Sequence, residues 1–180
     1  MDRLNENIVI PIKGLPFGES SFRFEIGKAF FQAFENIQIK DADCTVSVSV
    51  VRHQTLLDIA CGITGFVVVE CDRCLEDLIL KVDIMPRLTA GFGNVEVGGE
   101  DSAEEDILVV DRTQSELSLD QFVYDYVCLG LPLVKVHPEG KCNPEMLRYL
   151  SESGGTEDGS EGETTRPFEG LKDLLEEKNN

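Results

Sequence analysis

The sequence has no tryptophan and few bases: 16 Lys and Arg stand against 34 Asp and Glu, and the formal net charge is −18. Binding to nucleic-acid phosphates requires clustered Lys and Arg, so this composition argues against a protein that coats RNA or DNA. It favours a basic protein partner, such as a ribosomal protein or an assembly factor. The alternative interpretation is that the acidity serves solubility alone.

Long apolar runs are also missing from the sequence. No segment approaches the ~20 apolar residues that a membrane-spanning helix needs, and the first residues, "MDRLNENIVIPIKGLP", hold acids instead of the apolar block of a signal peptide. We therefore expect no contact with a membrane and a location in the cytoplasm. Structural disulfides are rare in that compartment. The six cysteines are then left with metal binding, catalysis or burial.

Hydrophobic periodicity predicts an α+β fold, a mostly antiparallel sheet with a few helices packed on it. Alternating apolar residues are typical of strands and a spacing of three to four of helices. Gly62 and Gly65 indicate a bulge or sharp twist within one strand. Ser118 and Gln121 are spaced as a capping box, and Asn143 with Pro144 marks a helix start. The predicted strands are 8–13, 21–27, 44–52, 56–71, 75–86 and 107–111, and the predicted helices are 28–36, 118–132 and 144–152.

Composition divides the chain into three parts. We expect a single α+β domain over residues 1–150, an acidic flexible linker over 151–166 and a C-terminal helix over 167–178. The Gly-rich, acidic stretch 91–106 is expected to be a flexible loop. The C-terminal helix carries apolar residues at helical spacing and would dock on the body of the protein or on a partner.

The stretch "VVVECDRCL" at 67–75 places two cysteines at the turn between two predicted strands. A C-x-x-C turn can supply two of zinc's four ligands, because tetrahedral zinc favours thiolate and imidazole. The second pair would be His137 and Cys142, five residues apart on a loop rich in Pro and Gly. Cys71, Cys74, His137 and Cys142 together would form a closed Cys3His site, with a structural instead of a catalytic zinc ion.

Two other interpretations of the cysteine pair remain open. A thiol-disulfide oxidoreductase would use Cys71 and Cys74 as a redox couple, although such couples usually stand at a helix N-terminus and this pair lies between strands. Arg73 would lower a thiol pKa there, and four neighbouring acids would oppose it. Alternatively, both residues are reduced, buried thiols without a role. Leu75 also occupies a position where zinc turns often have glycine.

The remaining candidates for chemistry are few. The sequence holds no phosphate-binding loop, no G-x-S-x-G elbow and no H-E-x-x-H motif. Cys44, Cys61 and Cys128 fall on strand faces or in a helix and are interpreted as packing residues. His53 follows a strand and is interpreted as a surface or half-buried residue. We therefore expect a protein that is not an enzyme.

Three stretches resemble the YceD family of bacterial and plastid proteins, which is linked to accumulation of large-subunit ribosomal RNA. They are "VVVECDRCLEDLILKV", "ELSLDQFVYDYVCLGLPLVKVHPEGKC" and "RPFEGLKDLL", in that order along most of the chain. Cys71, Arg73 and Cys74 match the family's C-x-R-C turn, and Cys142 matches a later cysteine. Many relatives have several cysteines in that later region, where this chain has one together with His137.

The resemblance implies a non-enzymatic factor that supports large ribosomal subunit assembly or ribosomal RNA accumulation. Combined with the acidity of the chain, it favours contact with basic ribosomal or assembly proteins. Direct RNA binding is the weaker alternative, and Lys135, Lys141 and Arg148 are the bases near the predicted zinc site that would serve it.

Overall fold

The computed structural model describes residues 7–92, 106–111 and 113–153. The chain falls into two compact units, Met1–Leu147 and Arg148–Asn180. The predicted C-terminal helix at 167–178 lies outside the described residues, as does most of the predicted linker, whose first three residues belong to a helix instead.

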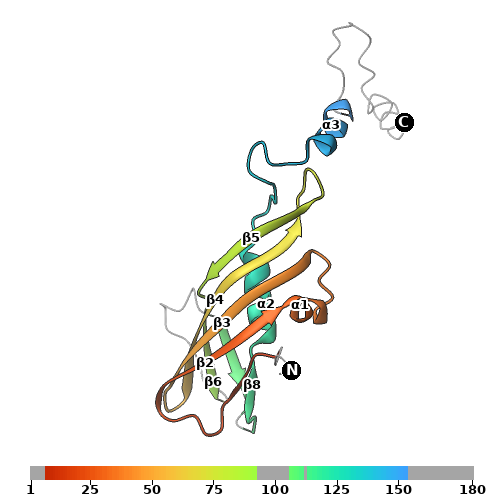
Figure 1. Cartoon of the computed structure of the whole chain (residues 1–180). Coiled ribbons are helices and arrows are strands. Elements are labelled where there is room, and N and C mark those ends of the chain that lie inside the picture. The colour runs from red at the N-terminus through yellow and green to blue at the C-terminus, as the bar shows by residue number, and fades with distance from the viewer. Residues whose placement is uncertain (1–6, 93–105, 112, 154–180) are drawn as a thin grey trace, which may run out of the picture. The chain divides into compact units, whose positions relative to one another are not determined.

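Eight strands and three helices make up the described part of the chain (Figure 1). In chain order they are β1 (Val9–Pro11), β2 (Gly18–Gly27), α1 (Lys28–Ala33), β3 (Ile39–Arg52), β4 (Leu56–Glu70), β5 (Asp77–Ile84), β6 (Arg87–Phe92), β7 (Asp106–Val110), β8 (Glu116–Ser118), α2 (Asp120–Gly130) and α3 (Pro144–Ser153).

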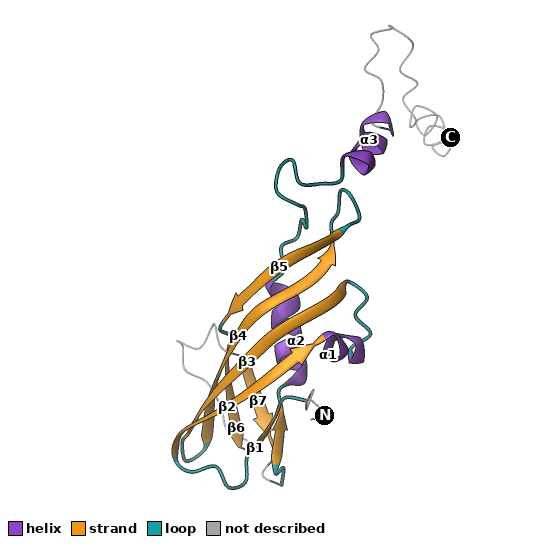
Figure 2. Ribbon diagram, in the orientation of Figure 1, coloured by secondary structure: helices purple, strands orange, loops and turns teal. Residues whose placement is uncertain are grey.

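One six-stranded sheet dominates the first unit (Figure 2). Its order is β2-β3-β4-β6-β7, and β5 pairs with the second half of β4, whose first half pairs with β6. All pairs are antiparallel except β6 with β7. A separate two-stranded sheet joins β1 to β8. The predicted α+β class with a mostly antiparallel sheet is confirmed.

Alternation along β3 and β4 builds the core. Val46, Val48 and Val50 are buried on one face of β3, while Ser47 and Ser49 lie on the other. Helix α2 packs against this sheet (Figure 1), and its Val123 and Val127 are fully buried. Burial of each such side chain contributes about 1.5–3 kcal/mol.

The phenylalanine-rich helix α1 joins the same core. Phe31 is fully buried and Phe30 almost so, as expected from their helical spacing. Phe34 stacks on Tyr124 of α2, with ring centroids 4.2 Å apart. Asn36 adds a hydrogen bond from its side-chain amide to the Tyr124 hydroxyl at 3.0 Å. The start of β3 is thereby fixed to α2.

Of the bulge or sharp twist predicted at the two glycines of β4, the bulge does not form. The pairing of β3 with β4 is continuous at both positions, and its one register shift lies between Ile39 and Asp41. Gly65 instead permits a close approach of two backbones, because a Cβ there would lie 2.2 Å from the Asp43 carbonyl oxygen. Its φ of +152° is also unfavourable for other residues.

Three further predictions need correction: the start of the loop at 91–106, the Ser118–Gln121 capping box and the start of the following helix at Ser118. Strand β6 follows Pro86 directly, and its last two residues occupy the start of the predicted loop at 91–106. Helix α2 begins at Asp120 and has Leu119 at its N-cap, so the Ser118–Gln121 capping box does not form. Ser118 closes β8 and donates its hydroxyl to Asp120, while Gln121 donates to Asp125. Pairing with β1 thus takes Ser118 out of the helix.

Candidate metal centre

The four predicted metal ligands converge, and we call them the clasp: Cys71, Cys74, His137 and Cys142. Their ligand atoms all lie within 4.8 Å of one another. Cys71 follows β4 directly and Cys74 lies in the turn before β5, whereas the other two residues belong to the loop between α2 and α3. The three thiols are buried and the imidazole is half-buried.

The turn after β4 positions the two clasp cysteines. The N–H of Leu75 donates to the Cys71 carbonyl at 3.0 Å, and the N–H of Cys71 donates to the Glu76 carbonyl at 2.9 Å. Leu75 adopts a φ of +60°, in the left-handed region that favours glycine. This conformation explains why glycine is common at that position in zinc turns and shows that Leu75 still permits the turn.

Two polar ties fasten the distant loop to the turn. The backbone N–H of Asp72 donates to the Lys135 carbonyl at 2.7 Å, and the Asp72 carboxylate accepts the N–H of Lys135 at 2.6 Å. On the other side, the Asn143 amide donates to the Glu76 carboxylate at 2.7 Å. Asp72 and Glu76 are two of the four acids expected to oppose thiol ionisation, and their role in holding the loop was not predicted.

A third contact orients the imidazole. Nε2 of His137 lies 3.2 Å from the backbone carbonyl oxygen of Asp77. A carbonyl accepts hydrogen bonds and cannot donate, so Nε2 carries a proton, and the neutral form of the ring has its lone pair on Nδ1. Nδ1 lies 3.4 Å from Sγ of Cys74 and 3.9 Å from Sγ of Cys142. A ring held this way is typical of histidine ligands.

The electrostatics of the clasp favour a thiolate at Cys71. Burial opposes ionisation, but hydrogen bonds from backbone N–H groups, including those of Cys74 and Arg73, outweigh it and lower the pKa of Cys71 to about 6. The hydrogen bond with Cys71 in turn raises the pKa of His137. Burial, followed by the hydrogen bond with Cys71, raises the pKa of Cys142. A thiolate at Cys71 therefore lies beside His137 and Cys142 within the clasp, where a cation would bind.

The spacing of the ligand atoms fits a tetrahedral ion. Sulfur ligands about 2.3 Å from one zinc ion, at tetrahedral angles, lie about 3.8 Å from each other, and a sulfur and a nitrogen ligand lie about 3.5 Å apart. Sγ of Cys71 and Sγ of Cys142 are 3.9 Å apart. This distance and the two sulfur–nitrogen distances above are close to those values, so the four residues could hold a metal ion.

The other cysteines lie away from the clasp. Cys44 and Cys61 are buried in the sheet, and burial raises the pKa of Cys61 to about 12 and that of Cys44 to about 11. Cys128 is half-buried on α2 beside Asn36. Their placement agrees with the predicted packing roles. His53 is exposed and contacts Asp58 at 2.8 Å.

The setting of the cysteine pair bears on the redox alternative. Cys71 follows a strand, and the next element after Cys74 is strand β5, so the pair does not stand at the helix N-terminus that activates most C-x-x-C couples.

Of the three bases that direct RNA binding would use, Lys135 is half-buried and Lys141 is exposed. Arg148 belongs to the second unit.

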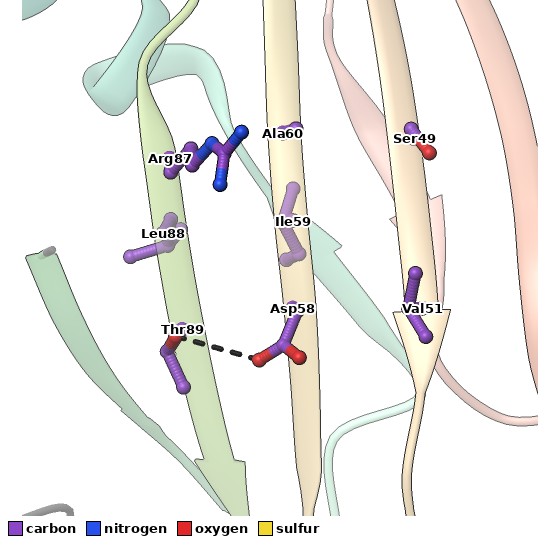
Figure 3. Close-up of a pocket in the computed structure, with 8 residues that line it drawn as sticks. All are labelled: Ser49, Val51, Asp58, Ile59, Ala60, Arg87, Leu88 and Thr89. Carbon is purple, nitrogen blue, oxygen red and sulfur yellow. Dashed lines mark hydrogen bonds between the residues drawn. The ribbon is translucent and has the colours of Figure 1, made fainter.

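A pocket of about 270 Å³ opens on the sheet between β3, β4 and β6 (Figure 3) and was not predicted. The hydroxyl of Thr89 donates to the Asp58 carboxylate at 3.5 Å, and His53 holds the other oxygen of that carboxylate. Both oxygens of the Asp58 carboxylate thus have partners, and we assign no chemistry to the pocket. Its lining residues are Ser49, Val51, Asp58, Ile59, Ala60, Arg87, Leu88 and Thr89.

No helix among the described residues is long and apolar enough to cross a membrane.

No curated protein and no solved structure matches the chain. A protein family does match, over residues 59–175, which is more than half of the chain and includes all four clasp residues. Its description is "Large ribosomal RNA subunit accumulation protein YceD", which names no catalytic activity. By this match the chain belongs to the YceD family.

Proposed function

We propose that this protein supports large ribosomal subunit assembly, and with it ribosomal RNA accumulation, as a cytoplasmic factor without catalytic activity. Membership of the YceD family supports the process. The net charge of −18 supports the means, which is contact with basic ribosomal or assembly proteins instead of direct contact with RNA phosphates.

The clasp is proposed to bind one zinc ion with a structural role. The observation that carries this proposal is the convergence of three thiols and one imidazole nitrogen within 4.8 Å, from segments more than sixty residues apart. A site with four protein ligands keeps no open position for a substrate. When bound, the ion would fix the loop between α2 and α3 to the turn after β4.

Metal analysis tests the zinc proposal. Protein purified without added metal should contain about one zinc per chain, as a four-ligand site does, measured by inductively coupled plasma mass spectrometry. Cys142→Ser should lose the metal, whereas Cys128→Ser, which changes a half-buried cysteine outside the clasp, should retain it. Metal-free wild-type protein, or equal zinc contents in the two variants, would refute the assignment.

The alternative is a thiol-disulfide oxidoreductase that uses Cys71 and Cys74. The lowered pKa of Cys71 favours it, because thiolates are the reactive form. A single experiment separates the two proposals: thiols are titrated before and after chelation. Zinc-bound, protected clasp cysteines support the structural site, whereas a metal-free protein with one fast-reacting thiol supports redox chemistry.

Sucrose-gradient analysis of ribosomes tests the role in assembly. A strain that lacks the protein should accumulate less large subunit relative to small subunit, and the wild-type chain should restore the ratio. Cys128→Ser should restore it as well. Normal subunit ratios without the protein would contradict the proposed function, whatever the metal content of the clasp.

A further inference from the structure

Strand β7 ends the six-stranded sheet and has one partner. It pairs with β6 in parallel, from Leu88 opposite Asp106 to Phe92 opposite Val110, and Figure 2 shows it beside that strand. β8 follows β7 along the chain but pairs with β1. Within the described residues, the second edge of β7 therefore has no strand on it.

The side chains of β7 are unusual for an edge strand. The sequence "ILVV" at 107–110 is continuously apolar, as in parallel strands that are covered on both faces. Here Ile107 is 44% exposed, Leu108 38% and Val109 63%, whereas Val110 is buried. Apolar side chains are thus open on both faces of a strand with a free edge. Such an edge is a template for pairing with another chain.

Charge selects the kind of chain that fits this edge. Acidic residues stand at both ends of the strand, since Asp106 is its first residue and Asp111 follows its last. Backbone and side-chain hydrogen bonds from Thr113 lower the pKa of Asp111, which stays ionised. Antiparallel pairing with a second copy would bring Asp111 of one chain close to Asp106 of the other, and like charges close to each other across paired strands are destabilising. Basic side chains in those places would be attracted instead.

We propose that β7 is a docking edge, where an extended segment of a basic partner protein adds as a further strand of the sheet. Backbone hydrogen bonds to the free edge would give affinity, and alternate apolar side chains would cover Ile107 and Val109 on one face and Leu108 on the other. This inference rests on the proposed function, since it locates the contact with basic proteins that the function requires.

Peptide binding to the full-length chain tests the docking edge. The probe is a fluorescein-labelled heptapeptide of alternating Lys and Val, with an alternating Glu and Val peptide as its charge control, measured by fluorescence anisotropy. The basic peptide should bind at least about tenfold more tightly than the acidic one. Val109→Lys should weaken its binding about tenfold, by removing an apolar contact and adding a like charge to the edge.

Ile79→Lys is the matched control, because Ile79 on β5 is 67% exposed and the change in net charge is the same. It should alter binding by less than about twofold, since exposed charges far from the edge are screened. In the wild-type chain the basic peptide should also slow amide hydrogen exchange at 107–110, a readout that does not depend on how the variants fold. Equal weakening by the two lysine variants, or unchanged exchange in β7, would overturn the docking edge.

Sedimentation separates failure of this inference from failure of the proposed function. Wild-type chain should co-sediment with large-subunit precursors in a sucrose gradient, and Val109→Lys should not. Co-sedimentation of both chains would refute the docking edge and leave the assembly role standing. Normal subunit ratios in a strain without the protein would refute the assembly role, while the peptide experiment would still decide what β7 binds.

Discussion

The sheet and the clasp use the same residue type in opposite ways. Cys61 lies inside the sheet and its pKa rises to about 12, because burial disfavours the charged thiolate. Cys71 is equally inaccessible to solvent, yet its pKa falls to about 6 because hydrogen bonds from backbone N–H groups outweigh the effect of burial. Burial alone thus makes a thiol inert, whereas backbone amides around a buried thiol favour the thiolate, the form that can bind a metal.

The two regions also differ in what holds them together. The sheet is fixed by apolar side chains and by backbones in direct contact, as at Gly65. The clasp is fixed by a few polar ties between the turn after β4 and the loop after α2. We therefore expect large effects from small changes of volume in the sheet, and effects confined to metal binding from changes at the clasp.

The largest effect should come from a single methyl group in the sheet. Gly65→Ala should lower the free energy of unfolding by about 3 kcal/mol or more, because the new Cβ meets the backbone of Asp43 and Cys44, which cannot yield without breaking strand pairing. Gly140→Ala is the control in the clasp loop: its φ is +77° and no atom lies within 4 Å of the new Cβ. It should cost only the strain of that conformation, about 1 kcal/mol.

Urea denaturation of the two glycine variants measures this difference. A Gly140→Ala protein as unstable as Gly65→Ala would show that the clasp loop is as tightly packed as the sheet. Equal stability of Gly65→Ala and the wild type would contradict the close approach of β3 and β4.

Thiol reactivity should give the second-largest effect. At pH 8 without metal, Cys71 is almost fully ionised, whereas a thiol with a pKa of about 12 is ionised in about one chain in 10,000. The lower intrinsic nucleophilicity of the Cys71 thiolate cancels about 500-fold of that advantage. Alkylation by iodoacetamide should therefore be about twentyfold faster at Cys71 than at Cys61, as followed by peptide mass spectrometry.

Added zinc sharpens the same measurement. It should slow alkylation of the three clasp cysteines and leave Cys44 and Cys61 unchanged, because only the clasp residues would bind the metal. If zinc protected the sheet cysteines as well, the protection would reflect global stabilisation instead of coordination.

A smaller effect is expected from the polar tie at Asp72. Asp72→Ala removes the carboxylate that accepts the N–H of Lys135, and with it the tie that holds the loop to the turn. Zinc affinity should fall about tenfold, the usual effect of removing a supporting contact, as measured by competition with a chelating dye. Glu139→Ala, a change at an exposed acid of the same loop, should leave the affinity unchanged, and a tenfold loss there would assign the effect to net charge.

The sequence predicted these two regions unequally. Alternation along 44–52 and 56–71 predicted β3 and β4 because the apolar period follows directly from burial of one face. The start of β3 at Ile39 was missed, since Lys40 and Asp41 do not show that period. The glycines in β4 predicted a bulge or sharp twist, and the close approach at Gly65 was missed because it depends on the backbone of the partner strand.

The clasp shows the same limit. Preferred zinc ligands at suitable spacing were enough to predict Cys71, Cys74, His137 and Cys142, and the structure brings these four together. The acids that tie the loop could not be predicted, because the role of Asp72 depends on a backbone N–H that is 63 residues away in the chain. Ligand types are visible in a sequence, whereas contacts from side chain to distant backbone are not.

The smallest effect is expected where the two regions meet. Nζ of Lys40 on β3 lies 2.9 Å from Asp77 and 3.1 Å from Glu70, and hydrogen bonds to Asp77 and then to Glu70 raise the pKa of Lys40. Interactions that raise a lysine pKa on folding stabilise the folded state. This stabilisation is fully present at pH values below the pKa of the unfolded chain, and it disappears as the pH rises through the pKa of the folded chain. Because the ion pairs are exposed, Lys40→Ala should lower the melting temperature by less than about 2 °C at pH 7, and the difference from wild type should disappear as the pH rises through the folded pKa of Lys40. Differential scanning fluorimetry from pH 7 upward measures both.

Lys40→Gln is the matched control, which keeps most of the aliphatic chain without the charge, and it should behave like Lys40→Ala. A drop as large as that of Gly65→Ala, or a loss of zinc as large as that of Asp72→Ala, would mean that exposed charges join the clasp to the sheet, and the division between a packed region and a polar-tied region would be wrong.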